Sequence, residues 1–154
     1  MKRMMSLVCL GILLVGCTRS SDFTRLKTYL EQTTENQIDS GMLFARLKPV
    51  YEPLDKGVPF LLSMTESANR KDAIAAYLAL SELCSQVKMQ PTPQGQAQVE
   101  KIKPKELFKR FDELDRMKIG GNWAVWLSMA HRTMKQALEQ TAAGDVANRA
   151  APEK

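Results

Sequence analysis

The sequence predicts an all-α fold, a small bundle of four to five helices. Three observations favour it. Apolar residues recur at spacings of three and four along most of the chain, which is the period of a helix with one buried face. Proline, glycine and asparagine separate these segments where helices are expected to begin and end. The alternating apolar and polar runs typical of strands are missing from the sequence, and so is any repeat of fixed period.

The start of the chain, 1–16, differs in composition from the rest. Lys2 and Arg3 give a positive start, and the run that follows, 4–16, carries no charge. A membrane-spanning helix needs about 20 apolar residues, so this run is too short to be one. A positive start followed by an apolar segment of roughly 7 to 15 residues is typical of a secretory signal peptide. The segment 1–16 is therefore predicted to be a signal peptide.

The run ends in Leu14-Val15-Gly16-Cys17, which resembles the lipobox of bacterial lipoproteins. The resemblance covers only the segment 1–18, but both the order of the residues and their position fit. It implies that the Cys17 thiol receives a diacylglycerol, that cleavage follows Gly16, and that the new amine of Cys17 is palmitoylated. Two or more acyl chains hold a protein on a membrane where one chain does not. A stable lipid anchor at Cys17 is therefore expected.

The residues after the anchor bear on its location. In Gram-negative lipoproteins an aspartate directly after the acylated cysteine tends to mark retention in the inner membrane. This chain has Thr18 there, so the resemblance implies the outer membrane, with the domain facing the periplasm. The segment 17–21 is predicted to be the lipidated cysteine and a polar tether. Four extended residues reach about 14 Å, so the domain is expected close to the membrane.

Removal of the signal changes the charge and the cysteine count. Of the 22 Lys and Arg in the chain, Lys2 and Arg3 leave with the signal, whereas all 17 Asp and Glu remain. The small positive excess that is left does not by itself indicate nucleic-acid binding, and none is expected. Cys9 leaves with the signal and Cys17 becomes a thioether, which leaves Cys84 as the free thiol. In an oxidising compartment Cys84 is expected to be buried or paired between chains.

The domain itself is predicted over 22–143, beginning with a helix capped by Ser21 or Asp22. The apolar positions of this first helix are Phe23, Leu26 and Leu30. The segment 36–41 is predicted to interrupt it, and a second helical segment follows over 42–48.

Prolines and a glycine are expected to limit the next stretch. Pro49 and Pro53 should end regular structure, because proline lacks an amide donor and restricts the residue before it. Gly57 is predicted to break the chain again, and Pro59 to open a new helix. The apolar residues of that helix are Phe60, Leu61 and Met64.

Asn69 is the predicted N-cap of the central helix, 70–88, with Asp72 in its first turn. The apolar arc of this helix is broad, which predicts the most buried element of the fold. The segment 90–98 is polar and contains two prolines, and it is predicted to form an exposed loop.

Two further helices are predicted. Pro104 can open the first, and Gly120 and Gly121 should end it. Its apolar stripe consists of Leu107, Phe108, Phe111, Leu114 and Met117. Asn122 is the expected cap of the second, and Gly144 its expected end. Its buried face consists of Trp123, Leu127, Ala130, Met134 and Leu138. The segment 144–154 is predicted to be a disordered tail.

The residues that could carry catalysis are sparse. The sequence has none of the nucleophile-elbow, phosphate-loop, dinucleotide or zinc-protease motifs, and its single histidine excludes sites built from several imidazoles. Cys84 and His131 could in principle form a thiolate pair, but Cys84 lies in the most apolar stretch and His131 is expected to be solvated. Glu66-Ser67 resembles the Glu-Ser pair of some lytic transglycosylases, without the rest of that motif. No enzyme, cofactor or metal is expected.

Two features are candidates for binding. Trp123 and Trp126 lie about 60° apart around a helix, so one can face the core while Trp126 meets a protein partner. The densest basic run is a candidate contact for an anionic membrane surface, although a solvated helix start is the more ordinary explanation. This run consists of Lys101, Lys103, Lys105, Lys109 and Arg110.

These observations predict an outer-membrane lipoprotein whose helical periplasmic domain binds a protein partner. Its anchor and architecture are similar to those of pilotins and other accessory factors of secretion, pilus or conjugation machines. Helical pilotins of one type II secretion family carry an internal disulfide, which this chain cannot form. Two alternatives remain: a lipoprotein that blocks the uptake of plasmids, phage or toxins, and one that binds a lipid or small ligand.

Overall fold

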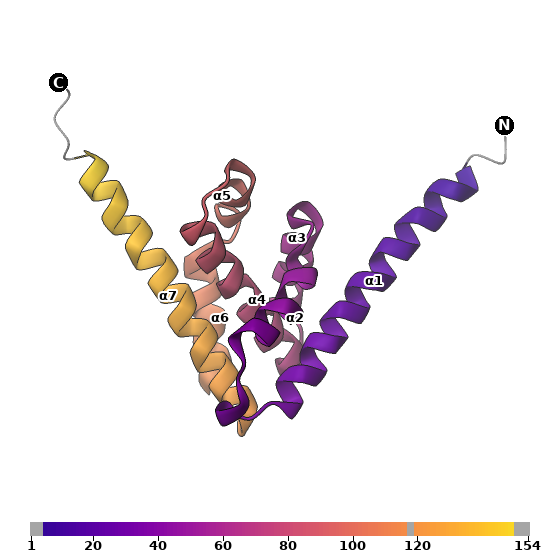
Figure 1. Ribbon diagram of the computed structural model, residues 1–154, viewed down its shortest axis with the longest axis horizontal. Coiled ribbons are helices and arrows are strands. Elements are labelled where there is room, and N and C mark those ends of the chain that lie inside the picture. The colour runs from indigo at the N-terminus through magenta and orange to yellow at the C-terminus, as the bar shows by residue number, and fades with distance from the viewer. Residues whose placement is uncertain (1–4, 117–118, 150–154) are drawn as a thin grey trace.

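The computed structural model describes the backbone of residues 5–116 and 119–149. Side chains are described within these ranges except for residues 5–18, 35, 104, 105 and 138–149. Over the described residues the chain is all-helical, without strands, and the predicted fold class is confirmed (Figure 1). In chain order the elements are α1 (Met5–Gln32), the short 3₁₀ helix η1 (Glu35–Gln37), α2 (Ser40–Tyr51), α3 (Leu54–Thr65), α4 (Arg70–Met89), α5 (Pro93–Val99), α6 (Pro104–Arg116) and α7 (Asn122–Arg149).

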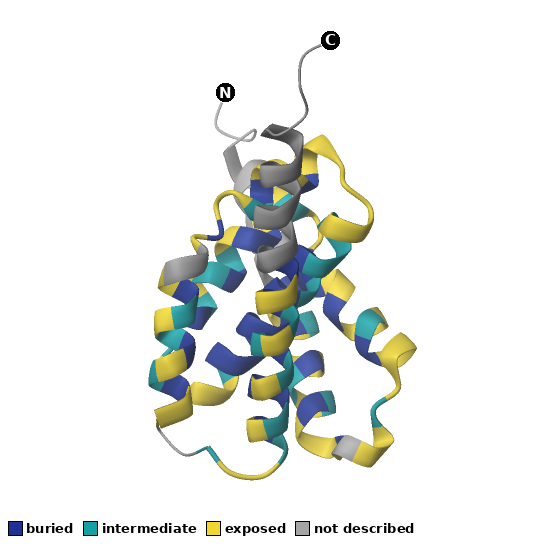
Figure 2. Cartoon of the chain, turned by 90° about the vertical axis from the view of Figure 1, so that its left-hand side faces the viewer, coloured by how far each residue is buried: buried dark blue, intermediate teal, exposed yellow. Residues whose placement is uncertain are grey.

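Helix α4 is the centre of the bundle, as its broad apolar arc predicts. Residues 73–81 are all buried, so this helix has no solvent face over more than two turns. It packs against α7 most extensively and also against α1, α2 and α3. Figure 2 shows how the buried positions of the surrounding helices line their inner sides. The prediction that this helix is the most buried element of the fold is therefore confirmed.

Contacts made by polar side chains show the relative directions of the three long helices α1, α4 and α7. Lys27 of α1 pairs with Asp72, and Glu31 pairs with Lys71, so α1 runs antiparallel to α4. Lys71 lies over the ring of Trp123, near the start of α7, while Lys88 donates to the Gln136 carbonyl further along it. Helices α4 and α7 are therefore parallel. Toward the two chain termini α1 and α7 diverge from each other (Figure 1).

The predicted start of α4 is confirmed in detail. The Asn69 side-chain oxygen accepts a hydrogen bond from the Lys71 amide at 3.1 Å. Asp72 occupies the first turn, where a negative charge is favourable because the helix dipole is positive there. The cap and the acidic residue together fix where this central helix begins.

Pro53 lies between α2 and α3, as predicted, but the other two prolines behave differently from the prediction. Pro49 lies inside α2 and Pro59 inside α3, which begins earlier, at Leu54. Each proline removes one main-chain hydrogen-bond donor from its helix. Both helices continue because their inner faces are fully packed, with Val50, Val58 and Leu61 at 0% exposure. Tertiary packing outweighs the local preference at these two places.

Gly57 is not a break either. It lies inside α3, where a Cβ atom would come within 2.0 Å of the Tyr51 carbonyl oxygen. Non-bonded atoms do not approach so closely, so a side chain at this position is excluded unless the helices move. The glycine allows the end of α2 and the first turns of α3 to touch, and the two helices therefore pack closely at the bend between them.

The predicted loop 90–98 contains a helix. The Thr92 hydroxyl oxygen accepts a hydrogen bond from the Gly95 amide at 3.1 Å, and Pro93 occupies the first helical position. Gly95 packs against Val87 of α4, and Gln98 is 7% exposed. This extra element, together with α2 and α3, is why the described residues hold seven α-helices and not four or five.

The two ends of the described chain also extend further than predicted. Helix α1 is continuous through residues 18–21, so the expected tether is helical. Helix α7 passes Gly144 and ends at Arg149, so residues 144–149 of the predicted tail are helical and 150–154 lie outside the described residues. None of the helices formed by the described residues combines the length and the apolar character needed to cross a membrane.

Candidate functional site

The first described side chain after the predicted anchor, Arg19, is buried, with 9% exposure. Its Nη1 donates to the Val50 carbonyl at 3.4 Å and its Nη2 to the Glu52 carbonyl at 3.3 Å. Carbonyls at the end of a helix lack partners within it, and a nearby positive charge complements the negative end of the helix dipole. Arg19 thus caps the C-terminus of α2 and fixes α1 two residues after Cys17.

The residues that follow Arg19 hold α1 against the bundle. Phe23 packs edge-on against Phe60 of α3, with ring centroids 5.4 Å apart. Leu26 and Leu30 continue the same face at 0% exposure. The spacing of 19, 23, 26 and 30 is the signal by which the sequence could have placed Arg19 on this buried face. The folded domain therefore begins almost at the predicted lipid attachment.

The basic run does not act as one group. Lys101, Lys103 and Lys109 are exposed, and the side chain of Lys105 lies outside the described ones. Arg110 is turned inward, where its Nε donates to the Thr65 carbonyl at 3.0 Å and its Nη2 to the Ser67 carbonyl at 3.2 Å.

The third contact of Arg110 is an ion pair with Glu113 at 3.0 Å. Its guanidinium is thereby engaged at the C-terminus of α3, as that of Arg19 is at α2. Within the described part of the basic run, the surface candidates for an anionic partner are thus Lys101, Lys103 and Lys109, with Arg110 in a structural role.

A groove of about 290 Å³ lies between α3 and the first turns of α6. Lys103 and Glu106 form an ion pair at its edge, with a distance of 3.2 Å and both side chains 71% exposed. A pair so exposed contributes at most about 1 kcal/mol. The groove is lined by Leu62, Thr65, Glu66, Lys101, Lys103, Glu106 and Leu107. Its two lysines balance its two carboxylates, so it offers no excess charge of either sign to a ligand.

Both tryptophans lie in the core. Trp126 is 1% exposed, and its indole Nε1 donates to the Leu30 carbonyl at 2.9 Å. Trp123 is 6% exposed, with the Lys71 ammonium 5.8 Å from the ring centroid. The two rings join α7 to the last turn of α1 and to the start of α4. A protein partner could reach Trp126 only if α7 moved away from α1.

The Cys84 thiol is buried at 4% exposure, one of the two states expected for it. Burial raises its pKa to about 12, so the thiol stays protonated and unreactive at neutral pH. The Cys84 side chain therefore serves the packing of α4, where its neutral form is favoured.

His131 is not solvated as predicted, but half-buried against two aromatic rings. Its ring centroid lies 3.8 Å from that of Phe111 and 5.1 Å from that of Phe108. Desolvation lowers the pKa of His131, and the carboxylate of Asp112 partly opposes that shift. The imidazole thus fills a place between α6 and α7 in its neutral form.

Within the described part of the chain, no group of three or more histidine, cysteine, aspartate or glutamate side chains is arranged to hold a metal ion. No protein-family model, curated protein or solved structure matches the chain.

Proposed function

We propose that the chain is an outer-membrane lipoprotein of a Gram-negative bacterium, anchored through acylated Cys17. The observation that carries this proposal is the lipobox-like Leu14-Val15-Gly16-Cys17 behind a positive start and an uncharged run. Thr18, in place of an aspartate, supports the outer membrane as its location. The acyl chains supply the membrane affinity, at about 0.8 kcal/mol for each buried methylene group.

The helical domain serves as a partner-binding accessory factor of an envelope machine, such as a secretion, pilus or conjugation system. The side chains that could take part in catalysis are each engaged in packing or in capping a helix. This supports a binding role for the domain. Cys84 is buried with a raised pKa, His131 lies between aromatic rings, and Arg110 caps α3. An anchor of this kind keeps the domain at the membrane where such machines assemble.

Labelling cells with palmitate tests the anchor. Wild-type protein should take up the label, and Cys17→Ser should take up none and keep its signal peptide. Cys9→Ala is the matched control, because Cys9 lies in the predicted signal and its loss should leave labelling at Cys17 unchanged. Normal palmitate uptake by Cys17→Ser would remove the basis of the proposal.

Separation of the two envelope membranes on a density gradient tests the location. Wild-type protein should sediment with the outer membrane, and Thr18→Asp should move it to the inner membrane. Thr18→Ser, which keeps a neutral hydroxyl, should behave as wild type. Recovery of the wild-type protein in the inner-membrane fraction would contradict the outer-membrane assignment.

Crosslinking in intact envelopes tests the partner-binding role. A channel or other machine subunit should be the main crosslinked species, and its yield should fall when Cys17→Ser prevents acylation. Native mass spectrometry of the purified protein covers the alternative role of ligand carrier. A lipid or small molecule that co-purifies stoichiometrically, with no protein crosslinked, would favour that alternative.

A further inference from the structure

We infer that the lipid anchor orients the domain, and that Met89 at the end of α4 lies in the phosphate-rich headgroup layer of the membrane. The inference rests on the proposed acylation of Cys17. The surface concerned, called the membrane-proximal end, consists of the last residues of α4 and the turn that leads to α5, residues 88–92.

The site of the proposed anchor is held close to the helical bundle. Arg19 is held by two carbonyls at the end of α2, and Phe23 packs against Phe60 one turn later. Cys17 lies only two residues before Arg19, a rise of about 3 Å in a helix. The attachment point of the acyl chains therefore stays within the length of the segment 17–19 from the bundle.

The end of α4 lies beyond the level of the proposed anchor, measured along the α4 axis. Lys27 lies opposite Asp72 in these antiparallel helices, so Arg19, eight residues earlier, is level with Leu80. Met89 lies nine residues beyond Leu80, about 14 Å further along α4. Because Cys17 lies only about 3 Å beyond Arg19, the end of α4 extends about 10 Å past the anchor along this axis. The lean of α1 away from α7 toward its N-terminus adds to this difference (Figure 1).

The place of the anchor and the length of α4 together select the orientation of the domain at the membrane. The acyl chains of Cys17 enter the hydrocarbon, and the headgroup layer outside it is about 5–7 Å thick on each side. The end of α4 reaches about 10 Å beyond the anchor, which is more than the thickness of this layer, so the domain must tilt about Cys17 for that end to lie within the headgroups and not in the hydrocarbon. This tilt removes apolar surface at Met89 from water, which favours it over a tilt in the opposite direction.

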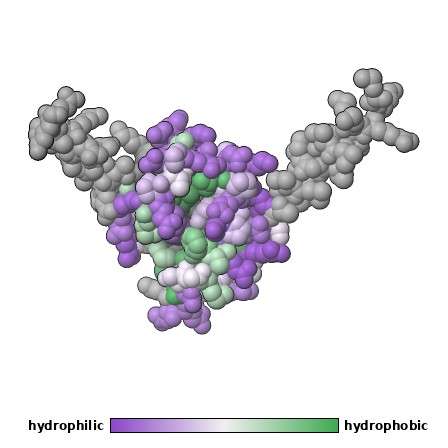
Figure 3. All heavy atoms as spheres, turned by 45° about the horizontal axis from the view of Figure 1, so that its top comes forward, coloured by the Kyte–Doolittle hydropathy of each residue, from purple (hydrophilic) through white to green (hydrophobic). Residues whose placement is uncertain are grey.

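The side chains at this end suit such a contact. Met89 is 65% exposed, a flexible apolar side chain at the last position of α4. Val87, two residues earlier, is partly buried and packs against Gly95 of α5. Lys88 is exposed next to Met89; its ammonium donates one hydrogen bond to the Gln136 carbonyl and keeps two further N–H groups that can meet lipid phosphates. Figure 3, which brings the upper side of Figure 1 forward, shows apolar atoms ringed by polar ones on the described surface.

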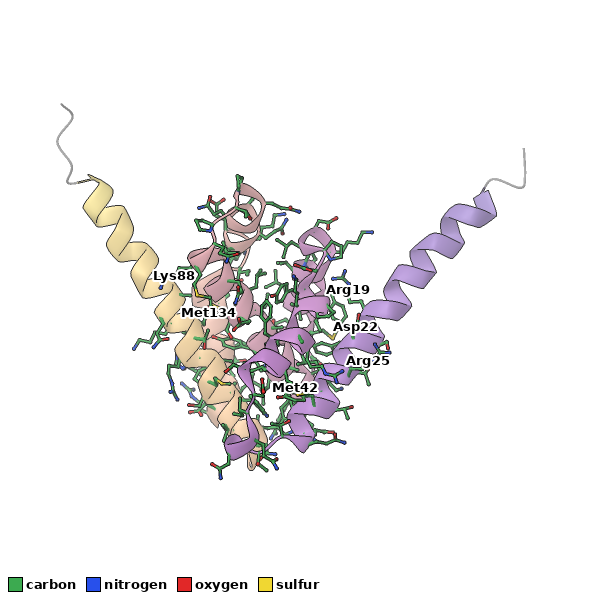
Figure 4. The ribbon with its side chains drawn as sticks, in the orientation of Figure 1. Arg19, Asp22, Arg25, Met42, Lys88 and Met134 are labelled. Atoms are coloured by element: carbon green, nitrogen blue, oxygen red, sulfur yellow. The ribbon has the colours of Figure 1, made fainter. Side chains whose placement is uncertain are left out.

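The chain offers a matched control on its other side. Met42, in the first turn of α2, is an exposed large apolar residue as well, at 51%. It lies eight residues before Val50, whose carbonyl binds Arg19, and hence about 12 Å away from the anchor level in the opposite direction. Figure 4 shows Arg19 and Lys88 in the same upper part of the molecule and Met42 below both. The inference therefore predicts lipid contact at Met89 and water at Met42.

The test uses full-length, lipidated protein carrying Met89→Cys or Met42→Cys, labelled with an environment-sensitive fluorophore. The protein is reconstituted in phosphatidylethanolamine and phosphatidylglycerol vesicles that contain a headgroup nitroxide quencher. Cys17 is blocked by its lipid and Cys84 is buried with a raised pKa, so protein without a new cysteine should stay unlabelled. Quenching should be severalfold stronger at position 89 than at 42, with a blue shift only at 89.

Vesicle flotation separates the two ways in which the inference can fail. If the protein floats with the vesicles but the two labels are quenched equally, or only the label at position 42 is quenched, the orientation is wrong and the anchor stands. If the protein does not float, the anchor itself is refuted, and the orientation with it. Unlipidated Cys17→Ser protein should show no quenching at either position; strong quenching at 89 without the lipid would contradict an orientation imposed by the anchor.

Discussion

Several side chains of this protein satisfy main-chain carbonyls far away in the sequence. Trp126 is the most buried of them, and its indole donates to Leu30 at 2.9 Å. The carbonyl belongs to the last turn of α1, where no amide of the same helix is in place to bond it. Trp126 thus joins α7 to α1 through one hydrogen bond as well as through the apolar surface that its ring buries.

Replacing Trp126 should therefore cost more than replacing its neighbour. Trp126→Phe leaves the Leu30 carbonyl buried and unpaired, which we expect to lower the free energy of unfolding by about 1–3 kcal/mol, with a further loss from the smaller ring. Trp123→Phe is the control, because Trp123 has a cation contact with Lys71 worth at most about 1 kcal/mol. Urea unfolding measures both, and equal losses would contradict the role given to the indole.

His131 is expected to make the free energy of unfolding depend on pH. Desolvation lowers its pKa in the folded state below the ordinary value of 6.5, so protons bind more tightly to the unfolded chain. The stabilisation is present in full above that value and declines as the pH falls through it. We expect the free energy of unfolding to fall more between about pH 7 and pH 5 in wild type than in His131→Gln. Parallel pH profiles for the two proteins would show that His131 titrates normally.

At the scale of single elements, packing decides where sequence signals conflict. Asn69 and the apolar arc of residues 70–88 predict α4 correctly because the cap and the helical period agree. Pro49 predicts a helix end and Pro59 a helix start that do not occur, because fully buried faces hold α2 and α3 together around them. The capping signal of Thr92 and Pro93 is local but stands in a polar stretch, so the pattern favours a loop where α5 forms.

Contacts between distant residues mark the limit of prediction at this scale. Arg19 and Arg110 cap α2 and α3 from positions far away in the sequence. The sequence shows each arginine within a polar or basic stretch and gives no sign of the carbonyls that it meets. For the same reason the basic run suggests one continuous surface, whereas Arg110 is turned toward the interior.

The close contact between α2 and α3 at Gly57 predicts a large loss of stability when a side chain is added there. In Gly57→Ala the new methyl group would lie 2.0 Å from the Tyr51 carbonyl oxygen, so α2 and α3 must separate. We expect a loss of about 3 kcal/mol or more in the free energy of unfolding, at the upper end of overpacking costs. Gly120→Ala is the matched control, since a Cβ atom there meets nothing within 4 Å. Equal melting temperatures for the two variants would contradict the close approach.

At the scale of the whole molecule, Arg19 connects the predicted anchor to the bundle. Arg19→Ala leaves two helix-terminal carbonyls without their charged donor, and we expect a loss of about 1.5–3 kcal/mol in the free energy of unfolding. Arg25→Ala is the control further along α1, where the arginine is 67% exposed and its pair with Asp22 contributes at most about 1 kcal/mol. Thermal and urea unfolding of the unlipidated protein compare the two, and an equal effect would show that Arg19 does not hold α1.

The molecule as a whole is a central buried helix surrounded by others, with its N-terminal helix held from the second residue after the predicted lipid site. The sequence predicts the all-α fold class and the central helix correctly, because both depend on local pattern, whereas the anchor at Cys17 stays a prediction. The orientation that we infer has no such local signal, because it depends on how far α4 extends beyond the level at which α1 is fixed.

Mass spectrometry of the protein extracted from bacterial envelopes tests the central claim most directly. The account predicts a mature chain that begins at Cys17 and carries a diacylglyceryl group on sulfur and a palmitoyl group on its amine. A mature protein that begins at any other residue, or that has an unmodified Cys17, would contradict it.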